Sequence, residues 1–199
     1  MDEPLDLIPL DGIDLGYVRY ETEEEADAAM AAKRSAIELL RSYGVYEDVS
    51  EAQAAEEELK YIRARWEHQR RVGTEDKWRY VAQEFAWQEQ RDDCFAAAST
   101  SQTSRIVDFI ALKEGWTTFG ADCVKAYYQS DQLEKVCVKP PAEYIELLRL
   151  AGRPTDIVWK LHKMLPGQRL GGRGWVETAT KRLEGEGFVR CEALPQFFR

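Results

Sequence analysis

Two cationic side chains, Lys77 and Arg79, lie two positions apart in the segment KWRYVAQEF, residues 77–85. The aromatic and β-branched residues of this segment predict a strand, and side chains two apart on a strand face the same side. Two cations on one face are suited to hold a triphosphate, Arg79 through planar bidentate contact. Lys and Arg also line ordinary solvated strand faces, so the residues alone leave both interpretations open.

Asp122 is the second candidate for chemistry. It lies near the end of WTTFGADCV, residues 116–124, which we expect to form a strand. A carboxylate at the C-terminal end of a strand can face a cleft and supply an oxygen ligand to a metal ion. An aspartate in this place can instead cap a following helix, and the residues alone favour the cap.

The remaining pattern combines helices with short strands and therefore predicts an α+β fold. Capping boxes at Thr22–Glu25 and Ser50–Gln53 predict the starts of two helices. We expect helices at residues 23–43, 103–114, 142–151 and 175–186, and strands at residues 61–68, 77–85, 116–124, 136–138 and 157–161, the first two strands forming a hairpin. We also expect burial of Ile106, Phe109, Ile110 and Leu112, and a flexible loop at Gly171, Gly172 and Gly174.

The overall charge is acidic but unevenly distributed. The chain has 199 residues, a formal net charge of −9 and a pI of about 4.9. Nucleic-acid binders usually carry a basic face, so this balance is unfavourable for contact with a phosphate backbone. Basic residues nevertheless gather in RARWEHQRR and KLHKMLPGQRLGGR, residues 63–71 and 160–173. This distribution is compatible with a local positive groove on an acidic protein.

Cysteine and histidine usage argues against two classes of site. The chain has four cysteines without a CxxC pair and two histidines, so we expect neither a structural zinc site nor a disulfide scaffold. The N-terminal sequence MDEPLDLIPLDG lacks the basic start of a secretory signal, and no apolar run is long enough to span a bilayer. We therefore expect a cytoplasmic or nuclear protein that is not secreted and has no membrane partner.

Six blocks, in order along the chain, resemble the reverse transcriptase of copia-type retrotransposons. KWRYVAQEF (77–85) is similar to the family's KARLVARGF, FAAASTSQTSR (95–105) to FAPVASMTSIR, and GWTTFGADCVKAYYQ (115–129) to GWELHQMDVKTAFLN. VCVKPP (136–141) follows where the family has VYMKQPPGF, VWKLHKMLPGQRLGGRGW (158–175) resembles VCKLKKSLYGLKQAPRAW, and GFVRCEALPQFF (187–198) resembles GFKRSEADPCLF. The order and spacing of the blocks carry the resemblance, because each block alone is short.

The resemblance implies a fold and a domain organisation. Residues 31–199 would form the fingers and the N-terminal half of the palm of a right-hand polymerase, behind a flexible acidic segment at residues 1–30. The palm would contain an incomplete antiparallel sheet with packed helices. The implied activity is RNA-directed DNA polymerisation, in which two magnesium ions assist transfer of a nucleotide from a dNTP to a primer 3′-OH on an RNA or DNA template.

The resemblance also implies roles for particular side chains. Asp122 matches the family's catalytic metal ligand, and Lys77 and Arg79 match the residues that hold the triphosphate. Ala126 and Tyr127 match the floor of the sugar pocket, where a ring excludes a ribose 2′-OH. A core aromatic beside Tyr128 is an equally weighted alternative for Tyr127.

The segment from residue 166 to residue 174 corresponds to the family's contact with template and primer. Gly167 would permit close backbone approach, and Arg169 and Arg173 would meet phosphates. A plain glycine-rich turn before a helix is the alternative for the whole segment.

The sequence also departs from the family. The family's YVDD hairpin supplies further carboxylates, but no such motif occurs before the chain ends at Arg199. One carboxylate is insufficient for two magnesium ions, so we expect a truncated element without polymerase activity. Gln83 and Ala97 also replace a basic residue and a proline of the family. The alternative is a non-enzymatic retroelement remnant that binds a protein partner, as the acidic composition and the helix at residues 23–43 allow.

Overall fold

The structure is a computed structural model that describes residues 22–69, 77–85, 90–96, 101–118, 120–192 and 194–199. Within these residues helices and strands are interspersed, which confirms the α+β class. The helices are α1 (Glu23–Ser42), α2 (Glu51–Glu56), α3 (Ser101–Glu114), α4 (Ala126–Gln129), α5 (Ala142–Leu150) and α6 (Gly171–Gly185). The strands are β1 (Tyr46–Ser50), β2 (Lys60–Ile62), β3 (Ala64–Gln69), β4 (Lys77–Ala82), β5 (Val136–Val138) and β6 (Ile157–Leu161).

The strands form two sheets. The larger has the order β1-β6-β5-β2, and β3 and β4 form a separate antiparallel hairpin. In the larger sheet β6 is antiparallel to both β1 and β5, whereas β2 and β5 run parallel, so the sheet that was expected to be antiparallel is a mixed one. The single strand expected at residues 61–68 is divided at Arg63 into β2 and β3, which belong to different sheets.

The core is organised around Trp159 on β6, which is fully buried. Tyr46 stacks on its ring at a centroid distance of 3.8 Å, and Tyr80 and Tyr144 meet it edge-on at 5.7 and 5.1 Å. These four aromatic residues come from β6, β1, β4 and α5, so one cluster joins both sheets and a covering helix. Aromatic pairs in these geometries add to the free energy gained from burying their area.

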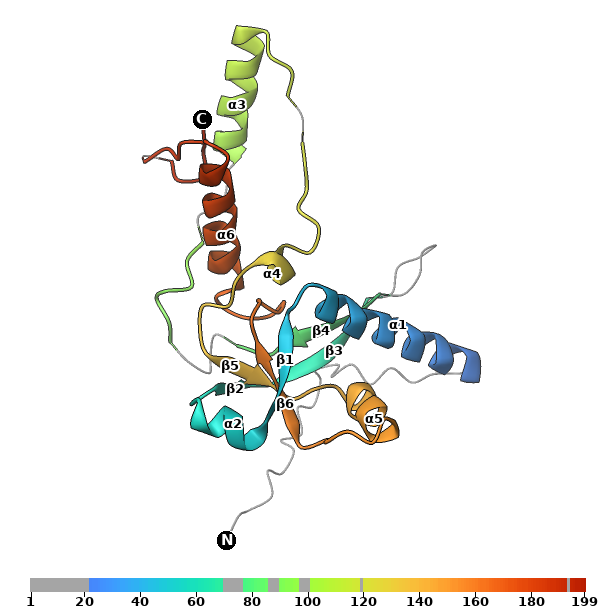
Figure 1. Ribbon diagram of the computed structural model, residues 1–199. Helices are drawn as coiled ribbons and strands as arrows, with labels where there is room; N and C mark the ends of the chain where they lie inside the picture. The colour runs from blue at the N-terminus through green and yellow to red at the C-terminus, as the bar shows by residue number, and fades with distance from the viewer. Residues whose placement is uncertain (1–21, 70–76, 86–89, 97–100, 119, 193) are drawn as a thin grey trace.

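Helix α1 lies across the β3–β4 hairpin, and α5 lies beside it (Figure 1). The expected cap is present, because the Thr22 hydroxyl accepts a hydrogen bond from the Glu25 amide at 3.2 Å. The Ser50 hydroxyl likewise accepts from the Gln53 amide at 3.1 Å at the start of α2. Helix α1 begins at Glu23 and therefore runs across residue 30, where the domain boundary was expected.

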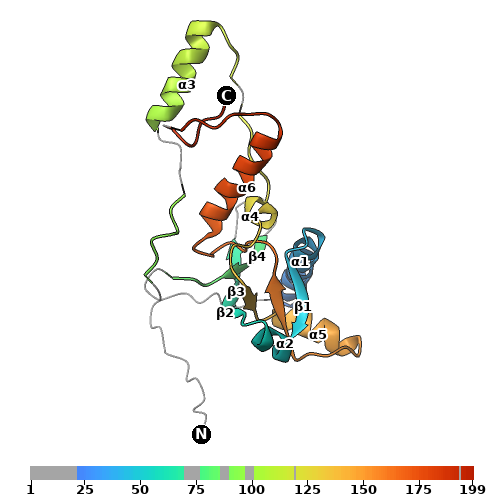
Figure 2. The ribbon, with the colours of Figure 1, turned by 60° about the vertical axis from the view of Figure 1, so that its left-hand side comes forward.

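Two expectations for the region around α3 are wrong. The described residues 115–118 and 120–125 form no strand, and α3 stands beyond α6, away from both sheets, in Figures 1 and 2. A strand needs a neighbour to pair its backbone groups, and none of the described strands lies beside this segment. The α3 side chains expected in the core are largely exposed: Ile106 by 46%, Phe109 by 67%, Ile110 by 41% and Leu112 by 84%.

The expected flexible loop at the glycines before Trp175 is also wrong, because α6 already begins at Gly171. Gly171 and Gly174 are buried in the first turns of the helix. A Cβ atom at Gly174 would lie 2.9 Å from the Met164 methyl group, closer than two carbons can approach. These glycines therefore serve helix packing rather than loop flexibility. Among the described helices, none is long and apolar enough to cross a membrane.

A partly buried ion pair connects α1, β3 and α5. Lys33 donates to Glu143 at 2.8 Å, and the Trp66 indole N–H donates to the other oxygen of the same carboxylate at 2.9 Å. Burial of Glu143 opposes its ionisation, but the hydrogen bonds from Lys33 and Trp66 outweigh that effect and hold the pKa of Glu143 below its ordinary value of 4.5. The ionised carboxylate of Glu143 on α5 thus accepts hydrogen bonds from side chains on α1 and β3.

The Glu143→Gln substitution is expected to destabilise the fold by about 1.5 kcal/mol at neutral pH, because charge-assisted hydrogen bonds are lost. A carboxyl group with a depressed folded-state pKa stabilises the fold above its unfolded pKa and loses that contribution as the pH falls through the folded pKa. The stability difference between the parent and the variant should therefore shrink as the pH drops below 4.5. Urea unfolding over a range of pH measures it.

Glu146→Gln is the matched control for this experiment. Glu146 lies on the same helix and, among the residues that the structure describes, pairs only with the exposed Arg149, so its loss should change stability little at any pH. A Glu143→Gln difference that stays constant down to about pH 3 would contradict the assigned role of the charge.

Candidate functional site

The β3–β4 hairpin places Lys77 and Arg79 on one face, as the sequence predicts. Lys77 is exposed and Arg79 half-buried, while the intervening Trp78 and the following Tyr80 are buried on the other face. Trp78 stacks on His68 at 4.4 Å and so anchors that inner face. The buried aromatic side thus fixes the direction in which the two cations point.

Lys125 brings a third cation to this face, from the turn before α4. Its backbone is left-handed, with φ of 58°, and its ammonium nitrogen lies 6.0 Å from the centroid of the Tyr128 ring. Partial burial, followed by the charges of Arg79 and Lys77, lowers the pKa of the Lys125 ammonium group. Three positive charges from two distant segments therefore converge. Sequence reasoning missed Lys125, whose only signal was its position directly before Ala126.

No carboxylate neutralises this cationic face within the part of the chain that the structure describes. Glu67 lies opposite Arg79 in the β3–β4 register, yet no ion pair joins the two side chains. Lys77 and Lys125 likewise have no ion-pair partner among the described residues. Adjacent like charges repel, so an unneutralised cluster of this kind favours binding of a polyanion.

Tyr127 lies on α4, two residues after Lys125, and is 37% exposed. Its ring packs directly on the backbone of Gly171, at the start of α6, where any Cβ atom would overlap the ring. The adjacent Tyr128 is the buried core aromatic and packs against Tyr43 at 6.1 Å. Ala126, the first residue of α4, accepts a hydrogen bond from the Ser130 hydroxyl at 2.9 Å and so fixes the turn that carries Tyr127.

The loop that contains Gly167 and Arg169 is attached to the end of β4. The Ala82 amide donates to the Pro166 carbonyl at 2.8 Å, and the Arg169 amide donates to the Glu84 carboxylate at 3.1 Å. Gly167 has φ of +90°, and a Cβ atom there would overlap the Ala82 carbonyl oxygen. Gly167 therefore allows the backbone of the loop to approach the backbone of Ala82, whereas the expected approach was to template and primer.

Arg173 is engaged in a network of intramolecular ion pairs. Its guanidinium donates to Glu177 at 2.7 Å and to the Asp93 carbonyl at 3.3 Å. The hydrogen bond to Glu177 raises the pKa of Arg173, while Arg91 holds the pKa of Asp93 at about 2. The predicted phosphate contact at Arg173 would have to compete with these carboxylates.

Asp122 lies exposed in the segment between α3 and α4, which is neither a strand end nor a helix cap. Lys125 occupies the N-cap position of α4, so the capping alternative for Asp122 is wrong as well. Among the described residues, no group of three histidine, cysteine or acidic side chains is placed to hold a metal ion. The donor set around Asp122 therefore does not fit two magnesium ions.

Comparisons with known proteins add no assignment. None of the protein-family models matches this sequence, and neither the curated proteins nor the solved structures give a significant match. The side chains described above are therefore the basis for a functional proposal.

The Gly167→Ala substitution is expected to lower the free energy of unfolding by at least about 2 kcal/mol, because it adds left-handed backbone strain to the overlap with Ala82. It should also displace the loop that carries Arg169. Urea denaturation measures the stability change. Gly185→Ala is the control, because a Cβ atom there meets no neighbour and should be neutral or slightly stabilising in α6. Equal effects of the two substitutions would contradict the close packing described at Gly167.

Proposed function

We propose that this chain is a copia-type reverse transcriptase domain, comprising fingers and the front half of a palm, that binds a deoxynucleoside triphosphate without polymerising it. The observation that supports the proposal best is the convergence of Lys77, Arg79 and Lys125, the last of which lies two residues before Tyr127. Two of these cations belong to matched positions of the family resemblance, and the third comes from the segment that carries Tyr127.

The chemistry of the cluster suits a triphosphate. Arg79 offers a planar fork for bidentate contact with phosphate oxygens, and Lys77 and Lys125 offer compact point charges. Binding of a polyanion would relieve the repulsion that lowers the pKa of Lys125. The ring of Tyr127 is positioned by its contact with the backbone of Gly171. It offers a flat surface on which a sugar and base can pack.

The same residues supply no polymerase chemistry. Nucleotidyl transfer requires acidic ligands that hold two metal ions about 4 Å apart, with the reacting oxygens in line between them. Asp122 is the one carboxylate matched to such a role, and it lies exposed in a segment without regular structure. We therefore propose retention of nucleotide binding without catalysis by these 199 residues.

Titration of the full chain with dTTP in magnesium buffer, followed by calorimetry, tests the proposed site. Arg79→Ala should weaken binding by about tenfold or more, because one charge-assisted contact contributes about 1.5–3 kcal/mol. Lys125→Ala should weaken it in the same direction. Arg105→Ala is the matched control, since Arg105 is an exposed arginine on α3. Absence of dTTP binding by the parent chain, or equal loss in the control, would contradict the proposal.

Primer extension tests the absence of catalysis. With a poly(rA)/oligo(dT) template-primer, dTTP and magnesium, we expect no extension by the full chain and none by Asp122→Asn. Extension by the parent chain, but not by Asp122→Asn, would refute the proposed inactivity and assign catalysis to that carboxylate. Urea denaturation of the Asp122→Asn variant checks that it is folded as stably as the parent chain.

A second candidate function is a non-enzymatic protein-binding role. It is favoured by α3, whose large apolar side chains, including Phe109 and Leu112, are exposed by 67% and 84%. Isolated exposed apolar residues are ordinary, but several on one helix indicate a contact surface. This candidate requires no dTTP binding, so the calorimetric titration separates it from the first. A Phe109→Ser variant should then lose the protein contact while keeping its stability.

A further inference from the structure

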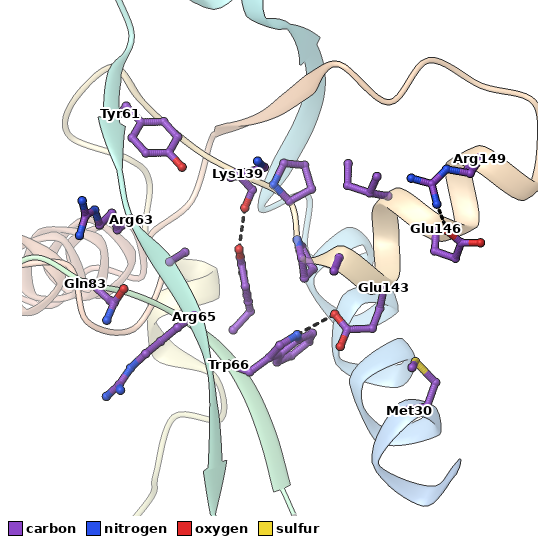
Figure 3. A pocket seen from close by; sticks show the side chains of 16 residues that line it. Met30, Tyr61, Arg63, Arg65, Trp66, Gln83, Lys139, Glu143, Glu146 and Arg149 are labelled. Carbon is purple, nitrogen blue, oxygen red and sulfur yellow. Dashed lines mark hydrogen bonds and ion pairs between the residues drawn. The ribbon is translucent and has the colours of Figure 1, made fainter. Parts of the chain in front are cut away.

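A groove of about 930 Å³ opens between the β2–β3 segment and the start of α5, outside the cationic face described above. Figure 3 shows Trp66 and Glu143, both among its lining residues, joined by a hydrogen bond. Trp66, Tyr80, Pro140 and Pro141 line its apolar part. The Tyr80 hydroxyl donates to the Lys139 carbonyl at 2.6 Å, and the Trp66 indole donates to Glu143, so both rings are fixed in place. The groove is therefore preformed rather than a gap between loose side chains.

The charges that line this groove are predominantly positive. Glu143 is bound by Lys33 and Trp66, and Glu146 is bound by Arg149. Arg63, Arg65 and Lys139 also line the groove, and their side chains have no ion-pair partner among the described residues. On a chain with a net charge of −9, three uncompensated cations around an aromatic floor form a local site for an acidic ligand.

Two exposed apolar side chains extend the floor of the groove. Tyr61 on β2 is 54% exposed, and Met30 on α1 is 39% exposed. Figure 3 shows them at different sides of the site, with Arg63 and Arg65 along the strand and Arg149 on the opposite helix. A ligand that matches the whole surface must therefore carry both apolar and acidic groups. A chain of alternating apolar and acidic residues has this composition.

The chain contains such a segment at its own N-terminus. Residues 1–21 hold six of the 36 acidic residues and only one of the 27 basic residues. Their sequence places aspartate next to leucine or isoleucine three times, at Leu5-Asp6-Leu7, Leu10-Asp11 and Ile13-Asp14-Leu15. Acidic–hydrophobic alternation of this kind is typical of segments that bind through short motifs. The leucines match the aromatic floor of the groove, and the aspartates match its arginines.

The tether makes this segment the favoured occupant. It joins α1 at Thr22, and Met30, eight residues further along the helix, already lines the groove. Eight helical residues span about 12 Å, whereas twenty-one extended residues can span about 70 Å. The segment can therefore reach the groove without strain. A short tether also raises the local concentration of the segment to about the millimolar range, which favours it over a free acidic peptide.

We propose that residues 1–21 bind in this groove, with their apolar side chains on Tyr61, Trp66 and Tyr80 and their aspartates on Arg63 and Arg65. Bound there, the segment shields the cations from other polyanions, nucleic acids included, because both would compete for the same charges. The proposal does not depend on the nucleotide site at Arg79.

Photo-crosslinking of the full chain tests the proposal. We would replace Leu7 with p-benzoylphenylalanine, irradiate, and locate the crosslinked peptides by mass spectrometry. The expected crosslinks join residue 7 to the peptides that contain Met30 or Tyr61, within one chain. The double substitution Arg63→Glu and Arg65→Glu should abolish them, and Arg105→Glu, an exposed arginine on α3, should leave them unchanged. High salt should reduce them, because it screens exposed charges.

A second variant tests the same contact without altering the groove. The triple substitution Asp6→Lys, Asp11→Lys and Asp14→Lys should also abolish the crosslinks, and it leaves Arg63 and Arg65 intact in case the double variant fails to fold. Crosslinks that map elsewhere, or that persist in the triple variant, would overturn the proposal. Crosslinks that join two chains, seen as a doubled mass, would overturn it in favour of a second copy as the occupant.

Shielding predicts a separate readout. The variant in which Asp6, Asp11 and Asp14 are replaced by serine should bind a single-stranded oligonucleotide more tightly than the parent chain in a fluorescence anisotropy titration. Equal affinity for the two chains would refute the shielding role.

Discussion

The packing of Trp159 is the interaction on which the rest of the structure depends. Its ring has no exposed surface and contacts Tyr46, Tyr80 and Tyr144, which belong to three other elements. The larger sheet by itself offers only short strands, and two short sheets rarely hold together without a shared core. The aromatic cluster supplies that core. It therefore fixes the hairpin that carries the cationic face relative to the helix that borders the groove.

Local sequence signals predicted the parts of the fold that local chemistry determines. The hydroxyls of Thr22 and Ser50 cap their helices because each can reach an amide three residues ahead. The alternation of Lys77 and Arg79 with Trp78 and Tyr80 likewise follows from the pleat of a single strand. The positions of Lys77 and Arg79 on the cationic face were thus predictable from the sequence. Lys125 was not, because it joins that face only through a tertiary contact.

The failed predictions concern residues whose environment is set by distant segments. Residues 116–124 have the composition of a strand, but composition cannot provide a partner for their backbone. The α3 side chains such as Phe109 have helical spacing, but no described element covers them. The glycine-rich sequence around Gly171 is typical of a loop, whereas in the structure Gly171 lies in α6 against the ring of Tyr127. A glycine is needed at this position because the Tyr127 ring leaves no room for a side chain, and helix propensity does not predict such a contact.

The division of one strand into β2 and β3 at Arg63 has a mechanical consequence. The Arg63 carbonyl accepts from the Gln83 amide at 2.8 Å, so the residue that connects β2 to β3 is also bonded to the residue that follows β4. Only Arg63 separates the end of β2 from the start of β3, so no loop lies between the larger sheet and the hairpin. The hairpin that carries Arg79 and the groove that Arg63 and Trp66 line therefore share one continuous stretch of backbone. The residue between the two strands is thus a direct connection between the two sheets.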